Sequence, residues 1–243
     1  VSVKDGSGTN FTGDGLFSSG SPPASSGTMI VYFTKQVNPS VALSETAQTV
    51  IVVDRLLTRI NAADHSIDLA LYSLSGDVGS SIASALIAAN GRGVKVRMIV
   101  EYDNSTTVPM TTMKNSGVPF ITDRFDAANG GGGLMHNKFG IFDYRDKSSA
   151  SDDWVWSGSW NATDPGNNND AQNVIEIQDQ ALANAYTIEF NEMWGSSSDA
   201  PAASTSRFGI RKTNNTPHRF SINGTRIELY FSPSDRTTSH IYD

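Results

Sequence analysis

The sequence contains no cysteine, so the chain forms neither disulfide bonds nor thiolate metal sites. It also lacks any run of the roughly 20 uninterrupted apolar residues that a membrane-spanning helix needs. Basic residues are in deficit, because 18 Lys and Arg stand against 25 Asp and Glu, for a formal net charge of −7. That charge disfavours long-range capture of nucleic acid or of an anionic membrane, although it is compatible with a local basic cleft. The chain is therefore predicted to be globular, with no integral membrane segment.

Glycine, serine, threonine and proline dominate residues 1–28. This composition buries too little apolar surface to offset the entropy of ordering, so we expect a flexible, extended arm. The chain starts with Val1 instead of Met and shows no charged, apolar leader. We therefore expect that a signal peptide has been removed and that the protein is secreted or periplasmic.

The region 29–195 is predicted to form one lobe in which strands and helices alternate. Apolar runs predict strands at 29–34, 66–74, 94–100, 118–122, 134–144, 153–160 and 173–178. Helical spacing predicts helices at 44–62, at 82–90, at 108–116 and at 181–194. Such alternation is typical of an α/β fold with a mixed, mainly parallel sheet flanked by helices.

The region after residue 195 changes character. Small and polar residues predict a linker over 196–224. Within the last segment, 225–243, the sequence Leu229-Tyr230-Phe231-Ser232 matches Val31-Tyr32-Phe33-Thr34 near the start of the lobe. Because this match follows a complete domain, we expect 225–243 to be the first strand of a second, incomplete lobe.

Five polar residues carry the predicted chemistry: His136, Lys138 and Asp143 form His-x-Lys-(x)4-Asp, and Ser159 and Asn161 follow on the neighbouring predicted strand. In an extended strand residues two apart face the same way, so both pairs project toward one point. An imidazole there can attack phosphorus, while the ammonium, hydroxyl and amide donate hydrogen bonds to the phosphate oxygens. These fixed donors replace a metal ion, so no metal or other cofactor is expected.

This pattern, completed by Gly-Ser-x-Asn at 158–161, closely resembles the signature of the phospholipase D superfamily. The resemblance extends over about 29–195, and its strongest stretches are 85–97, 134–143 and 190–194. It implies that His136 forms a covalent phosphohistidine and that a second His from another lobe protonates the leaving group. It also implies a supporting role for Asp143.

The chain departs from the family pattern in two places. Fourteen residues, 144–157, separate Asp143 from Gly158, where the family usually has about six, and we interpret them as a longer hairpin turn. The family's usual Glu after the Asn corresponds here to Gln172, a neutral amide that stabilises an imidazolium less well. Asp170 or Glu176 is a candidate to compensate.

Side chains outside the motif are interpreted as structural. Three tryptophans alternate along 154–160 and are expected in the core, with Trp160 as the candidate for stacking on substrate. Lys95 and Arg97 flank a strand and are expected to be solvated. The glycine-rich stretch 125–133 is expected to be a mobile loop near the site.

The sequence therefore predicts a metal-independent phosphodiester hydrolase, with three alternatives for its activity. The first is a nuclease that cleaves DNA or RNA, because 85–97 and the compact lobe resemble the secreted endonuclease branch of the family. The second is a phospholipase D that hydrolyses or transfers headgroups. The third is a weakly active or inactive phosphate-binding lobe, motivated by Gln172 and the single motif. In each case a C-terminal fragment or a homodimer mate would supply the second lobe.

Overall fold

The computed structural model describes residues 26–242 except 37, 39, 42–49, 131, 132, 147 and 148. The arm expected at 1–28 lies almost entirely outside these residues, and so does the predicted start of the 44–62 helix. Within the described residues no helix is both long and apolar enough to cross a bilayer.

Seven strands form one sheet in the order β1-β7-β6-β5-β2-β3-β4. They are β1 (Met29–Phe33), β2 (Ser66–Leu71), β3 (Lys95–Val100), β4 (Phe120–Thr122), β5 (Lys138–Phe142), β6 (Trp154–Gly158) and β7 (Asn173–Gln178). The expected mixed sheet flanked by helices is confirmed, but only the β2–β3 and β3–β4 pairings are parallel, and the other four are antiparallel. The connection between β5 and β6 is too short for a crossover, so these strands must pair antiparallel.

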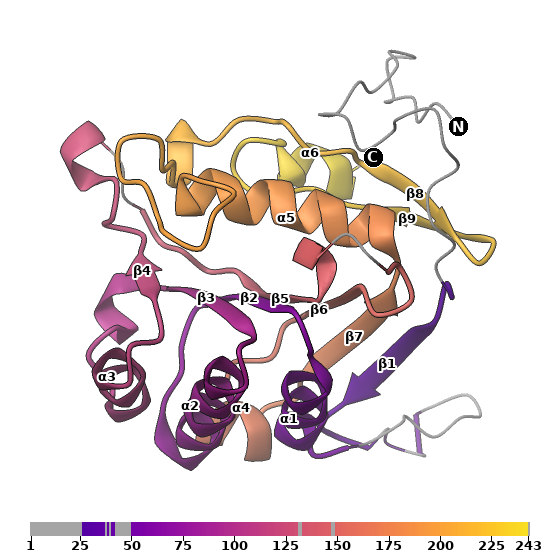
Figure 1. The fold of residues 1–243 in the computed structure, drawn as a ribbon. Helices are drawn as coiled ribbons and strands as arrows, with labels where there is room; N and C mark the ends of the chain where they lie inside the picture. Colours follow the sequence, from indigo (N-terminus) through magenta and orange to yellow (C-terminus); the bar gives the residue numbers. More distant parts are fainter. Residues whose placement is uncertain are drawn as a thin grey trace.

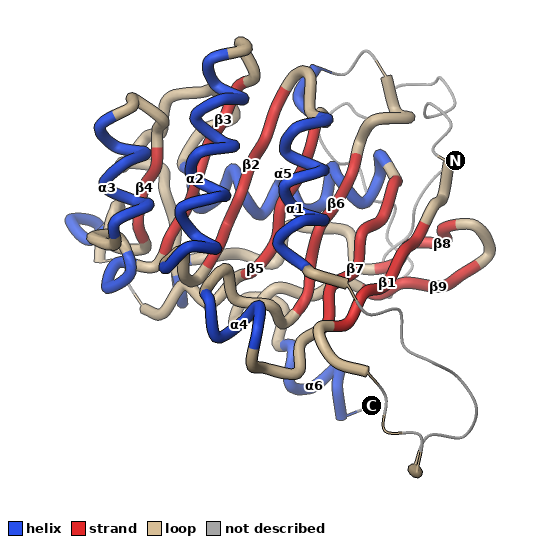
Figure 2. The backbone as a smooth tube through the Cα atoms, turned by 90° about the horizontal axis from the view of Figure 1, so that it is seen from below, coloured by secondary structure: helices blue, strands red, loops and turns tan. Residues whose placement is uncertain are grey.

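Helices cover both faces of the sheet (Figure 1). On one face α1 (Val52–Ala62), α2 (Gly76–Gly91) and α3 (Val108–Asn115) lie side by side across the strands (Figure 2). The other face carries α5 (Gln180–Trp194). The short helix α4 (Asp164–Asn168) comes just before β7 in the chain. Each face has its own hydrophobic core.

Among the described residues the first helix begins at Val52, and Val50 and Ile51 before it are not helical. Its buried stripe consists of Val52, Val53, Leu56 and Ile60, and these side chains pack in the core between α1, α2 and the sheet. Helical spacing predicts a stripe of Val50, Val53, Leu57 and Ile60. Of these, Val53 and Ile60 are buried, and Val50 and Leu57 are partly buried.

Arg97 on β3 is fully buried, which corrects the expectation of a solvated side chain. Its guanidinium binds both carboxylate oxygens of Asp68 on the neighbouring β2, at 2.7 and 2.6 Å. It also lies over the Phe190 ring of α5 and donates to the carbonyl of Ser198 at 3.0 Å. A charge can be buried at this position because it is paired and bidentate.

The chain beyond α5 returns across the face of the sheet that α5 covers. It contains the hairpin β8 (Arg219–Ile222) and β9 (Thr225–Glu228) and the helix α6 (Thr237–Tyr242). Phe208, Leu229 and Phe231 are buried in the core on this face, and Lys212 forms an ion pair with Glu189 of α5 at 2.6 Å. The division into a linker at 196–224 and a second lobe from 225 stays a prediction. In this structure both segments are packed against α5.

Candidate active site

Four strand ends meet at one edge of the sheet and bring most of the predicted site residues there. β5 runs antiparallel to both of its neighbours, β2 and β6, and β7 runs antiparallel to β6. The carboxyl ends of β2 and β6 therefore lie beside the amino ends of β5 and β7. Tyr72, Lys138, Ser159 and Gln172 each stand at or next to one of these ends.

His136 and Lys138 enter this edge from the amino end of β5. The strand begins at Lys138, so His136 precedes it instead of lying within it as predicted. The two are nevertheless close, since the Lys138 ammonium donates to the His136 carbonyl at 3.0 Å. The edge of the Tyr72 ring contacts the imidazole, with 4.5 Å between ring centroids, and its face lies 5.0 Å from the ammonium nitrogen.

The surroundings lower the pKa of both side chains. Partial burial and the nearby Lys138 charge lower the pKa of His136 below its usual 6.5. Burial lowers the pKa of Lys138 to about 8. At pH 7 the imidazole is therefore neutral and nucleophilic while the ammonium beside it is charged.

Ser159 and Asn161 lie beyond the carboxyl end of β6, on the far side of β5 from Tyr72. The Ser159 hydroxyl accepts the backbone N–H of Asn173 at 3.1 Å, and this contact fixes it at the strand end. The Asn161 side-chain oxygen is buried without a hydrogen-bond partner among the described residues.

Trp160 is not a stacking surface, which corrects the sequence-based interpretation. Its side chain is 1% exposed, and it packs edge-on against Trp156 in the core. β6 ends at Gly158, so strict alternation stops there and the indole turns into the protein. Its contribution to the site is to hold the segment that carries Ser159 and Asn161.

Gln172 is at the expected edge, but its side chain contacts Asp170, with an Nε2–Oδ2 distance of 3.4 Å. The aromatic ring that contacts the His136 imidazole, among the described residues, is that of Tyr72. Glu176 cannot compensate, because its carboxylate is buried against α1 and binds the guanidinium of Arg59. Tyr72 is therefore the side chain whose ring contacts His136 among the described residues.

Asp143 follows the carboxyl end of β5, at the opposite edge of the sheet from His136. Its buried carboxylate accepts the backbone N–H groups of Asp64, His65 and Ser66 at 3.1, 2.7 and 3.1 Å. The residue adopts φ of 62°, a left-handed conformation that aspartate tolerates better than most residues. The structure thus gives Asp143 a structural role and does not bring it to the site.

We expect Asp143→Ala to destabilise the fold by about 3 kcal/mol, because three backbone donors lose their buried acceptor and alanine disfavours positive φ. Chemical denaturation measures this loss. Activity per folded molecule should stay within about twofold of the wild type, since β5 separates Asp143 from His136. A large loss of activity with unchanged stability would instead place the carboxylate in the catalytic machinery.

Tyr72 has no place in the sequence motif, so only the pairing of β2 with β5 reveals it. We expect Tyr72→Ala to lower kcat about 10- to 100-fold with little change in KM, because the imidazole loses the ring that orients it. Tyr72→Phe, which retains the ring, is expected to stay within about threefold. Steady-state kinetics at several pH values tests this. In the alanine variant water should reach Lys138 and raise the pKa of its ammonium. Activity should therefore persist to higher pH than in the wild type.

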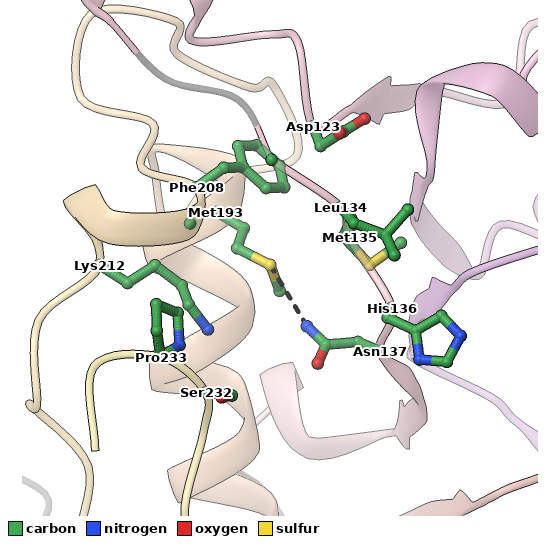
Figure 3. Close-up of a pocket in the computed structure, with 12 residues that line it drawn as sticks. Asp123, Leu134, Met135, His136, Asn137, Met193, Phe208, Lys212, Ser232 and Pro233 are labelled. Atoms are coloured by element: carbon green, nitrogen blue, oxygen red, sulfur yellow. Dashed lines mark hydrogen bonds between the residues drawn. The ribbon is translucent and has the colours of Figure 1, made fainter. Parts of the chain in front are cut away.

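A cavity of about 260 Å³ adjoins the site on the α5 side of the sheet (Figure 3). One wall is the segment 133–137, and the opposite wall comes from α5 and the returning C-terminal chain. The Asn137 amide points into it and lies 3.5 Å from the Met193 sulfur, while the His136 ring points the other way.

A group of side chains with the spacing of metal ligands lies away from His136. In the part of the chain that the structure describes, a group with suitable spacing consists of His65, Asp146 and Asp152, whose ligand atoms lie within 4.8 Å of one another. This group lies at the Asp143 end of the sheet, away from His136.

The fold and the polar side chains at this edge define an α/β lobe with a candidate phosphate-binding site. A family model described as "Cardiolipin synthase, PLD-like domain" matches residues 56–194. The chain therefore belongs to the phospholipase D superfamily, a family of phosphodiester hydrolases.

Individual relatives agree with this assignment. The "Mitochondrial cardiolipin hydrolase" of Xenopus tropicalis is 27% identical over 142 residues, which are 58% of this chain and 60% of that protein. The "Phospholipase D" of Rickettsia conorii is 30% identical over 133 residues, 54% of this chain and 58% of that protein. This chain thus spans about 60% of the length of these curated relatives.

The structure of Nuc, a phospholipase D family member from Salmonella typhimurium, shows the same fold. It matches with a TM-score of 0.50 and 24% sequence identity, covering 69% of this chain and 93% of Nuc.

Proposed function

We propose that this chain is the catalytic lobe of a metal-independent phosphodiesterase that acts through a phosphohistidine at His136 on nucleic acid. The observation that carries the proposal is the pairing of an imidazole and an ammonium whose pKa values are both lowered at the edge of the sheet. Burial lowers the pKa of both side chains, and the Lys138 charge lowers that of His136 further. A neutral nucleophile beside a fixed cation is suited to an anionic diester.

The reaction has two displacements. A ring nitrogen of His136 forms a bond to phosphorus while the bond to the leaving oxygen breaks, and the second histidine gives that oxygen its proton. Lys138, Ser159 and Asn161 donate to the non-bridging oxygens as negative charge grows on them. Water, deprotonated by the second histidine, then attacks phosphorus and releases His136.

The second histidine is proposed to come from a second copy of this chain or from a further lobe. His65 lies at the other end of the sheet, and His218 lies on the returning C-terminal segment, where its Nδ1 is 2.9 Å from the Leu229 carbonyl oxygen. His240 stacks on the Tyr230 ring, with 3.8 Å between ring centroids. Among the described residues none of these three histidines contacts His136.

Two features support nucleic acid as the substrate. The stretch 85–97 resembles the secreted endonuclease branch. The cavity beside His136 has apolar walls with an accessible amide, which suits a flat ring with polar edges better than a diacylglycerol.

Incubation with single-stranded DNA, plasmid DNA, RNA and vesicles of phosphatidylcholine and cardiolipin, all in EDTA, tests the proposal. Cleavage of DNA or RNA supports it. Release of choline or phosphatidic acid with intact nucleic acids would favour the phospholipase D activity after which the curated relatives are named. Binding of phosphate esters without turnover would favour a phosphate-binding lobe.

A further inference from the structure

We infer that the cavity between segment 133–137 and α5 is a base-binding subsite, which holds the nucleobase next to the scissile phosphate. This inference rests on the proposed nuclease function and names a site for the part of the substrate that the phosphate motif does not contact.

The position of the cavity follows from strand geometry. His136 and Asn137 are adjacent in an extended segment, so their side chains leave opposite faces. The imidazole turns toward Tyr72 and Lys138, and the amide turns toward Met193 (Figure 3). A phosphate at His136 therefore has the cavity on the other side of the same backbone segment, and His136 is itself among the residues that line it.

The lining fits a heteroaromatic ring. Leu134, Met135, Met193, Phe208 and Pro233 supply apolar and polarisable contacts. At about 260 Å³ the cavity is just smaller than the roughly 300–1,000 Å³ of sites that bury a drug-sized ligand, so it accommodates one ring system and not paired acyl chains.

The polar groups of the cavity suit a neutral base and not a second phosphate. The ammonium of Lys212 is bound to the Glu189 carboxylate at 2.6 Å, so its charge is already compensated. The Asp123 carboxylate, which accepts the Tyr102 backbone N–H at 2.8 Å, disfavours an anion and can accept from an exocyclic amine. The amide of Asn137 contacts only a weak thioether acceptor among the described residues, so it can pair with the edge of a base.

Binding to two single-stranded oligonucleotides of equal length tests the inference. One carries normal bases and the other carries abasic sugars throughout, so the second offers only the phosphate backbone. In the His136→Ala background, which prevents turnover, fluorescence anisotropy should show about tenfold tighter binding of the normal strand. Asn137→Ala and Leu134→Ala should reduce that ratio to about twofold or less, whereas the exposed control Val108→Ala should leave it intact.

Each outcome decides a separate point. Equal binding of both strands by the His136→Ala protein, together with cleavage of the normal strand by the wild type, would overturn the base subsite. The nuclease proposal would then still stand. Failure to bind either strand, with hydrolysis of phosphatidylcholine or cardiolipin vesicles, would overturn both. Because Leu134 is 66% exposed, its alanine variant should fold normally, and thermal unfolding checks this.

Discussion

His136→Ala is expected to lower kcat/KM for a phosphodiester by about 10⁴-fold or more, because the variant cannot form the covalent intermediate. The imidazole is exposed at the edge of the sheet and makes no core contact, so the fold should be unaffected. Rapid quenching with labelled substrate should trap label on the wild type in an acid-labile, base-stable form, as a phosphohistidine requires. The variant should carry none.

The matched control is His65→Ala, which removes an imidazole of the same kind from the other end of the sheet, where it lies 3.3 Å from Asp146. Its activity should stay within about twofold of the wild type. Retention of more than about one per cent of activity by His136→Ala would refute the nucleophile assignment.

The same variant can reveal where the second histidine comes from. If two copies of this chain complete one site, mixing wild-type and His136→Ala protein after subunit exchange should reduce activity more than simple dilution does, since mixed dimers retain only one of the two histidines. If a further lobe supplies it, activity should fall in proportion to dilution.

Much of the site could be predicted because strand periodicity and local motif spacing determine it. The antiparallel pairing of 134–144 with 153–160 is confirmed as β5 with β6, and it brings Ser159 to the edge that carries Lys138. The order of the sheet could not be predicted, because β1 pairs with β7 across more than 140 residues and no local pattern records that contact. For the same reason the sequence predicts a mainly parallel sheet, whereas most of the strand pairings are antiparallel.

Strand length explains why Asp143 is separated from the rest of its motif. At roughly 3.3 Å per residue, the seven steps from His136 to Asp143 cover about 23 Å. The two ends of the motif must therefore lie at opposite edges of the sheet, and this was deducible from the sequence. The burial of Arg97 was not deducible, because its partner Asp68 lies 29 residues away on another strand.

Lys138→Met is expected to lower kcat/KM by about 10³-fold, because a desolvated cation near the phosphate oxygens is lost at the point where charge grows. Lys138→Arg keeps the charge but places it differently, so an intermediate loss of about tenfold to 10²-fold is expected. The isosteric Lys95→Met on β3, at the far end of the sheet, should have little effect.

The pH profile distinguishes these variants more sharply than their rates do. His136 attacks only when neutral, so activity should rise with pH through its pKa, which burial and the Lys138 charge hold below 6.5. Lys138 stabilises charge only when protonated, so activity should fall as pH passes its pKa of about 8, which gives the profile an alkaline limb.

Lys138→Arg should therefore lose the alkaline limb, because a guanidinium stays charged at that pH. Lys138→Met should move the acid limb upward, since the imidazole no longer adjoins a cation. An unchanged alkaline limb in Lys138→Arg would assign that limb to another group and contradict the role of this ammonium.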